Sequence, residues 1–426
     1  MRRTILIIVA FFAAAVFLTA CIEQPGPMGP AGPQGEQGPP GPTGNDGQVG
    51  APGAPGQDGV SYTPPAFVGS ETCAECHEDL YAVFRQSGHP WKLTRVVNGE
   101  APDFPFSDIP RPPDGYSWDD ISYVIGGYNW KARFVDQQGY IITGADENAT
   151  TQYNLPNDEL GTNGGWVGYH AGEANLPYDC GACHTTGYSP EGHQDGLPGI
   201  EGTWAFPGVQ CEECHGPGSL HANHPMAYGM EIDRDAAACG QCHVRGDFTE
   251  VNAADGFIQH HEQYEELFQS KHAVIDCVLC HDPHSGVVQL QEAGAQTTRT
   301  LCENCHFKQE ENQNNEVHKS LTIECIQCHM PQLVRSAEGD AATFTGDIRT
   351  HMVAIDPTQI SQFNEDGTVA LSQISLDYAC RTCHRSDGLG RPKTDEELLQ
   401  VAINYHAAPT PAPVEAPAEA TATTTP

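Results

Sequence analysis

The pattern Cys-x-x-Cys-His occurs eight times in this chain of 426 residues and uses sixteen of its seventeen cysteines. Two thiols three positions apart, followed at once by an imidazole, are the groups that attach a haem covalently and give its iron one axial ligand. Zinc sites and redox dithiols also use Cys-x-x-Cys, but they place no demand on the next residue. The repeated histidine therefore favours haem over zinc or disulfides, and it predicts eight covalent haem c groups.

The motifs assign the attachment cysteines and the proximal iron ligands directly. The cysteines are Cys73, Cys76, Cys180, Cys183, Cys211, Cys214, Cys239, Cys242, Cys277, Cys280, Cys302, Cys305, Cys325, Cys328, Cys380 and Cys383. The proximal ligands are His77, His184, His215, His243, His281, His306, His329 and His384.

Twelve further histidines can supply the second axial ligands, whereas the chain has only six methionines. We expect the distal set to be His89, His170, His221, His261, His272, His284, His318 and His351, and we regard His193, His224, His260 and His406 as weaker candidates. Two imidazoles close both faces of an iron and favour electron transfer, whereas an enzyme keeps one face open to substrate.

The elements that carry these motifs are expected to be short. Seven motifs lie between Cys180 and His384, about one per thirty residues, so helices and loops must wrap closely spaced haems. Hydrophobic residues make up only 38% of the chain, and the porphyrins would supply the missing apolar surface. We predict a mainly α multihaem cytochrome fold with extensive loops.

One segment has a different pattern. From Tyr128 to Phe134 aromatic and small residues alternate with polar ones, and a turn at Gln137–Gly139 leads into the sequence YIIT. Alternation of this kind is typical of strands, so we predict a small β-rich insertion at about residues 115–170.

The N-terminal residues predict export. Residues 1–20 carry two arginines and a short apolar run, and the tetrad before and including Cys21 resembles a lipobox, which makes Cys21 the expected lipidated residue. Ile22 follows it where an aspartate would suggest inner-membrane retention, so we expect an outer-membrane lipoprotein facing the periplasm or the cell surface. A plain secretory signal with a stray thiol is the alternative.

Glycine then occupies every third position from Gly26 to Gly59, which is the collagen pattern. We assign residues 21–61 to the lipid anchor and a collagen-like stalk, residues 62–406 to the octahaem domain, and residues 407–426 to a disordered tail. The stalk either joins copies into a trimer or filament or serves as an extended linker in a single chain.

Charge limits the partners. Acidic residues outnumber basic ones 56 to 20, for a net charge of −36, which excludes nucleic acid as a partner. Redox proteins of opposite charge and extracellular acceptors such as metal ions and minerals remain suitable.

The stretches ETCAECHEDLYAVFRQSGH, GVQCEECHGPGSLH, CVLCHDPHSG, CHMPQ and GDIRTH resemble the multihaem c-type cytochromes of the cytochrome c-554 and c-prime type. The resemblance implies a mostly helical fold with stacked haem pairs, and it carries the distal role onto His89, His221, His272, His284 and His351.

That superfamily contains both electron carriers and enzymes. Its nitrite reductases usually have a lysine in place of one motif histidine, and all eight motifs here end in histidine. We therefore expect an electron-transfer protein without catalytic residues, and we retain as the alternative an octahaem reductase that acts on a small nitrogen or sulfur compound.

Overall fold

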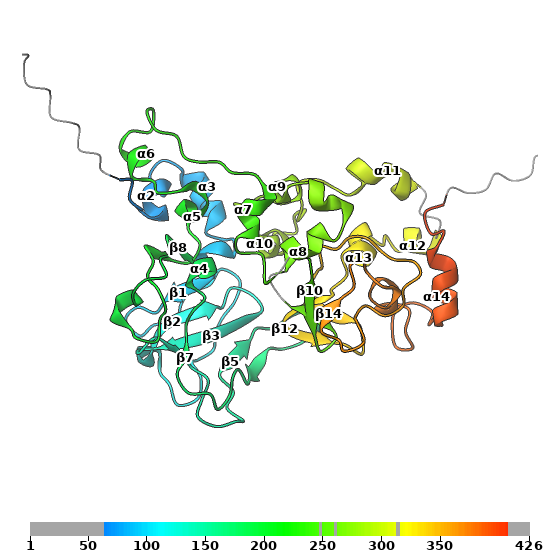
Figure 1. The fold of residues 1–426 in the computed structure, drawn as a ribbon, viewed down its shortest axis with the longest axis horizontal. Coiled ribbons are helices and arrows are strands. Elements are labelled where there is room, and N and C mark those ends of the chain that lie inside the picture. Colours follow the sequence, from blue (N-terminus) through cyan, green and yellow to red (C-terminus); the bar gives the residue numbers. More distant parts are fainter. Residues whose placement is uncertain (1–63, 247–248, 260–261, 312–315, 408–426) are drawn as a thin grey trace, which may run out of the picture. The chain divides into compact units, whose positions relative to one another are not determined.

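The structure is a computed structural model that describes residues 64–246, 249–259, 262–311 and 316–407, all within one compact unit of the chain (Figure 1). The expected signal segment, Cys21, the collagen-like tract, His261 and residues 408–426 lie outside the described residues. Among the residues that are described, no helix is long and apolar enough to cross a membrane.

A seven-stranded antiparallel sheet lies between the first two motifs in the sequence. Its strands are β1 (Leu93–Arg95), β2 (Ile121–Gly126), β3 (Lys131–Asp136), β4 (Tyr140–Ile141), β5 (Gln152–Asn154), β6 (Gly165–Val167) and β7 (Leu176–Pro177). The order is β1-β2-β3-β4-β7, and β5 pairs with both β3 and β6. Strands β2 to β6 fall within the segment for which the alternating pattern predicts strands, and β1 and β7 extend the sheet on either side.

Both faces of this sheet are buried, which explains why β2 and β3 are so apolar. Val124 and Phe134 contribute to one hydrophobic cluster, together with Trp91. Tyr123 and Val135 contribute to a second cluster that contains Tyr178. Since successive strand residues point to opposite faces, each of these strands serves two cores.

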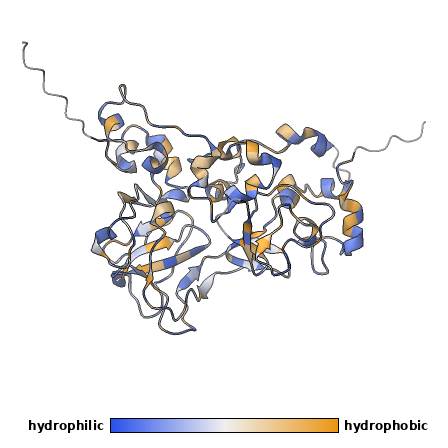
Figure 2. Ribbon diagram, in the orientation of Figure 1, coloured by the Kyte–Doolittle hydropathy of each residue, from blue (hydrophilic) through white to orange (hydrophobic). Residues whose placement is uncertain are grey.

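A second sheet, of five strands, forms in the C-terminal half of the chain. Its strands are β10 (Val251–Ala254), β11 (Phe257–Gln259), β12 (Val334–Asp340), β13 (Thr345–Ile348) and β14 (Val369–Ala370), in the order β13-β12-β11-β10-β14. Val251, Phe257, Ile258 and Val334 are each at most 1% exposed and form its core. Apolar residues gather on strands of both sheets in Figure 2. A third pair, β8 (Thr185–Thr186) and β9 (Phe206–Pro207), follows the second motif.

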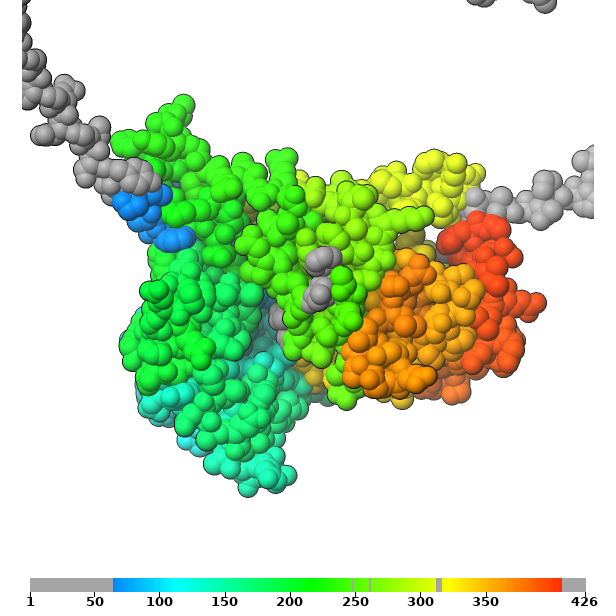
Figure 3. Space-filling model, in the orientation of Figure 1, coloured from blue at the N-terminus to red at the C-terminus, as the bar shows by residue number. Residues whose placement is uncertain are grey.

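The expectation of a mainly α fold is not confirmed, because the described residues form a mixture of short helices and sheets. The longest described helix, α11 (Glu303–Glu311), has nine residues and lies on the surface in Figure 3. The α-helices among the described residues are α2 (Ser70–Ala74), α3 (Glu78–Phe84), α4 (Gly181–His184), α5 (Cys211–His215), α6 (Ser219–Asn223), α7 (Ala236–Gly240), α8 (Gln263–Phe268), α9 (Cys277–Cys280), α10 (Val287–Glu292), α11, α12 (Glu316–Ser320), α13 (Cys325–His329) and α14 (Asp395–Ala402). A Cys-x-x-Cys-His motif needs only one helical turn, so the segments between motifs are free to form strands.

Candidate haem sites

Each Cys-x-x-Cys-His motif forms a single helical turn. Two motifs are the helices α5 and α13 themselves. In the other six, the backbone N–H of the histidine donates to the carbonyl of the first cysteine, at 2.8 to 3.2 Å. Residues three and four positions apart share one face of a helix, so this turn directs both thiols and the imidazole to the same side.

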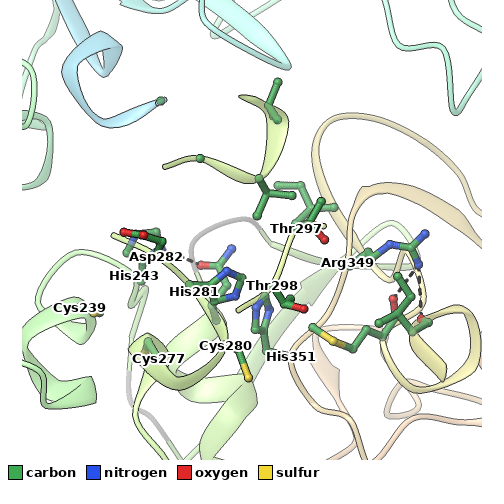
Figure 4. A pocket seen from close by; sticks show the side chains of 18 of the residues that line it. Cys239, His243, Cys277, Cys280, His281, Asp282, Thr297, Thr298, Arg349 and His351 are labelled. Carbon is green, nitrogen blue, oxygen red and sulfur yellow. Dashed lines mark hydrogen bonds between the residues drawn. The ribbon is translucent and has the colours of Figure 1, made fainter. Parts of the chain in front are cut away.

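One connected cavity, of about 5880 Å³, is lined by every cysteine and histidine of the eight motifs. Its lining runs from Val68 to His406 and brings together residues from nearly the whole described length of the chain. Figure 4 shows one part of such a lining, where the rings of His281 and His351 lie close together beside Cys280. The sixteen motif cysteines form no disulfide bonds, so both sulfurs of each motif are available for attachment.

Seven of the eight motif histidines lie near a second histidine within the described part of the chain. The separations of the ring centres are His77–His221 6.3 Å, His89–His243 6.3 Å, His215–His284 6.2 Å, His272–His306 5.8 Å, His281–His351 6.0 Å, His318–His384 5.9 Å and His329–His406 6.1 Å. In every pair, the second histidine comes from a different segment of the chain.

These separations fit a haem iron held between two imidazoles. Metal–nitrogen bonds of about 2.0 Å on both sides of an iron place the two ring centres roughly 6 Å apart. The ring planes range from nearly parallel, 4° for His215 and His284, to nearly perpendicular, 78° for His89 and His243. Rotation about a common axis through the iron allows both arrangements.

The other ring nitrogen is hydrogen-bonded in several of these histidines. In each case Nδ1 lies close to a backbone carbonyl oxygen. The distances are His215–Glu231 2.6 Å, His221–Tyr228 2.7 Å, His329–Val353 2.8 Å, His384–Arg391 2.8 Å and His406–Gln309 3.0 Å. A backbone carbonyl on Nδ1 fixes the tautomer and orients the ring, and it leaves Nε2 as the metal-binding nitrogen.

The structure brings six members of the expected distal set to a motif histidine: His89, His221, His272, His284, His318 and His351. His170 also lines the haem cavity; its ring lies against Tyr169, and its Nδ1 is 2.9 Å from a carboxylate oxygen of Glu173. His406, one of the weaker candidates, lies beside His329. His406 follows α14, near the end of the described residues.

Contacts and electrostatic interactions between cysteines of different motifs define which motifs are neighbours. The thiols of Cys73 and Cys211, of Cys183 and Cys242, of Cys239 and Cys277, and of Cys302 and Cys325 lie within hydrogen-bonding reach. Electrostatic interactions also join Cys214 to Cys239, Cys280 to Cys305, and Cys328 to Cys380.

These contacts arrange the motifs in a series. The motifs beginning at Cys73, Cys211, Cys239, Cys277, Cys302, Cys325 and Cys380 follow one another, and the motif beginning at Cys180 joins the series at Cys242 as a branch. Sequence spacing alone predicts that attached haems are close, but it does not reveal this branch.

The branch motif lies in a positively charged environment. The pKa of His184 is lowered to about 3, first by burial and then by the charges of Lys92 and Arg133. Burial also lowers the pKa of Lys92, whose charge acts on His89 and His243 as well. These imidazoles are therefore neutral at physiological pH, which is the form that binds a metal.

Comparison with known proteins supports haem attachment. Residues 167–216, which contain the motifs at Cys180 and Cys211, match the family described as cytochrome c554 and c-prime. The multihaem cytochrome MtrA of Shewanella baltica (strain OS185) is 27% identical over 135 residues, which cover 29% of this chain and 36% of that protein. The match thus spans about a third of the length of this curated relative.

Three solved structures are also similar. The octahaem sulfite reductase MccA of Wolinella succinogenes, form II, has a TM-score of 0.51 at 18% identity, over 81% of this chain and 71% of that chain. The outer cell wall cytochrome OcwA scores 0.43 at 18% identity, over 74% and 85% of the two chains. An undecahaem cytochrome from the S-layer of Carboxydothermus ferrireducens scores 0.39 at 20% identity, over 65% and 52%.

The likeness to MccA concerns the fold alone at this level of identity. It nevertheless agrees with the family match on two motifs, with the relationship to MtrA, and with a cavity lined by all eight motifs. The chain is therefore a multihaem c-type cytochrome that binds haem c covalently.

Proposed function

We propose that the protein carries eight haems and conducts electrons through them without catalysing a reaction of its own. The observation that carries this proposal is the set of seven histidine pairs, with ring centres 5.8 to 6.3 Å apart. Paired imidazoles hold an iron from both faces and leave no coordination position for a substrate. His170, which lines the haem cavity, and His261, which lies outside the described residues, remain the other predicted distal ligands.

Haem iron, when bound, supplies one-electron exchange between its ferric and ferrous states. The chain contributes position: contacts such as those between Cys239 and Cys277, and between Cys302 and Cys325, keep successive attachment points adjacent. The series of motifs would thus give electrons a route from the motif at Cys73 to the one at Cys380.

The environment of the branch motif supports a second candidate function. Lys92 and Arg133 place positive charge beside His184 in a chain with a net charge of −36. Local cations of this kind attract anions within a cleft even when the long-range field repels them. An octahaem reductase for a small nitrogen or sulfur compound would use this region.

Spin state separates the two functions. We expect purified holoprotein to carry eight covalent haems by mass spectrometry and to show only low-spin ferric signals in electron paramagnetic resonance. A substantial high-spin signal would favour the reductase. A mass that corresponds to fewer haems would contradict the haem count.

Turnover provides a kinetic test. The reduced protein should be oxidised rapidly by soluble ferric chelates or by a cationic redox protein, and it should not turn over nitrite, hydroxylamine, sulfite or tetrathionate. Exchange with the cationic partner should slow by about tenfold or more as salt rises from 0.01 to 0.5 M, because screening shortens the reach of the protein's negative field. Sustained turnover of nitrite, hydroxylamine, sulfite or tetrathionate would favour the reductase over the electron conduit.

The cellular location is part of the same proposal. We infer an outer-membrane lipoprotein that is held through Cys21 and a collagen-like stalk and that passes electrons to redox proteins, metal ions or minerals outside the cytoplasm. Cys21→Ser should release fully haem-loaded protein from the membrane fraction, because it alters none of the haem motifs. Continued membrane retention of this variant would contradict lipid anchoring.

A further inference from the structure

A second, smaller cavity, of about 200 Å³, lies between strand β3 and the strands of the five-stranded sheet. Its lining includes three cationic side chains, Lys131, Arg245 and Arg335, together with the polar residues Gln259 and Ser336. We call it the cationic cavity. No carboxylate is among the described residues that line it.

The three cations retain hydrogen-bond donors that the protein does not use. Within the described residues, the exposed guanidinium of Arg245 donates no hydrogen bond, although its positive charge acts on the carboxylate of Glu262. The Lys131 ammonium donates one bond, to the carbonyl of Ser336, and has three protons. Arg335 uses Nη2 for Asp255, at 2.7 Å.

The positive charges also oppose one another. The pKa of Lys131 is lowered to about 7, first by burial and then by Arg133, with further contributions from Arg245 and Arg335. Asp347 acts in the opposite direction, but its carboxylate already accepts hydrogen bonds from three backbone N–H groups, those of residues 336, 337 and 338. Both guanidinium groups thus repel the Lys131 ammonium, and an anion between the three side chains would offset this repulsion.

We propose that the cationic cavity binds a small free oxyanion of the phosphate or sulfate class. Charge-assisted hydrogen bonds from two guanidinium groups and one ammonium suit the several acceptor oxygens of such an ion. The volume of about 200 Å³ accommodates a compact oxyanion and excludes a nucleotide or another extended anion. Since the chain as a whole carries a charge of −36, binding depends on this local convergence of donors.

A haem propionate offers the same carboxylate chemistry and is the other source of an anion here. Arg245 lines both the cationic cavity and the large haem cavity, whereas Lys131 and Arg335 line only the smaller one. This separation favours a free ion. It also means that a propionate could compete only from the side of Arg245.

Calorimetric titration of the holoprotein with inorganic phosphate, and separately with sulfate, tests the proposal. We expect saturable binding at one site that chloride at equal ionic strength does not reproduce. Arg245→Gln and Lys131→Gln should each weaken binding by about tenfold to a hundredfold, which is the usual loss when one charged hydrogen-bond partner is removed.

Lys308→Gln is the matched control, because it removes the same charge from an exposed position of α11 that lines neither cavity. It should bind phosphate as the wild type does, and the haem absorption spectrum should be unchanged in all three variants. Equal weakening in Lys308→Gln would reduce the effect to general charge and would overturn the proposal. Absence of saturable binding to the wild-type holoprotein, as expected if a propionate fills the site, would also overturn it, whether or not the variants fold.

Discussion

The motif at Cys180 and the motif at Cys302 share one five-residue pattern but lie in different surroundings. The first follows β7 and has Lys92 and Arg133 beside its histidine. The second begins just before α11, its two cysteines are exposed, and the neighbouring Phe307 is 59% exposed. A haem's potential depends on burial and on nearby charge as well as on its ligands, so identical motifs predict different potentials here.

The two motifs also differ in their connections. The Cys180 motif meets the series through Cys183 and Cys242, whereas the Cys302 motif lies within the series, between Cys280 and Cys325. We conclude that the first is a branch and the second a link. Their loss should therefore have unequal consequences for electron transfer.

Removal of one attachment site should give the largest effect. Replacing both Cys302 and Cys305 by alanine should remove the haem that they attach. The haems before and after it in the series should then be disconnected, and electron transfer along the series should fall by orders of magnitude. The same change at Cys180 and Cys183 should leave the series conducting. Film voltammetry with the protein attached to the electrode through a tag after Pro426 would count the haems that exchange electrons, and equal counts in the two variants would contradict the branch assignment.

Exchange of one distal ligand should shift one potential strongly. His272 lies 5.8 Å from His306 between ring centres, so His272→Met should raise the potential of the Cys302 haem by on the order of 100 mV, because thioether ligation favours ferrous iron. Spectroelectrochemical titration measures the shift. His193→Met is the control, since Nδ1 of His193 lies 2.6 Å from the carbonyl oxygen of Ile200 and this residue does not line the haem cavity. An unchanged titration of the His272 variant would remove it from the ligand set.

Lys131, near the branch, should make stability depend on pH. Its folded pKa of about 7 is below the unfolded value, so the unfolded chain binds more protons between about pH 7 and 10.5 and stability should rise with pH over this range. The full shift would change the free energy of unfolding by at most about 5 kcal/mol. Chemical unfolding of wild type and Lys131→Met at several pH values would test it: the rise should be smaller in the variant, and an identical pH dependence would contradict the lowered pKa.

The smallest expected effect is the change in potential on removal of one buried charge. Lys92→Met should lower the potential of the haems bound by His184 and His243 by on the order of 50 mV, because a nearby positive charge stabilises the reduced iron. Lys308→Met, on exposed α11, should leave the potentials of the haems bound by His184 and His243 unchanged. A shift of similar size in both variants would indicate that the surroundings of the two motifs do not differ electrostatically.

Part of the fold could be predicted from local patterns and part could not. The alternation around Tyr128 to Phe134 predicts strands where β2, β3 and β4 form. The five-stranded sheet was missed, because its strands come from segments as distant as Val251–Ala254 and Val369–Ala370, each only a few residues long. Such short strands become stable only when their partners are in place.

The sequence by itself determined what is local: the cysteines, the proximal histidine of each motif, and the single helical turn that directs all three side chains to one side. Only the tertiary structure decided which second histidine lies opposite, because each pair joins segments that are far apart in the chain. His406, one of the weaker candidates from the sequence, lies beside His329. Spacing controls contacts within a helical turn, whereas long-range packing controls which two imidazoles can hold one iron.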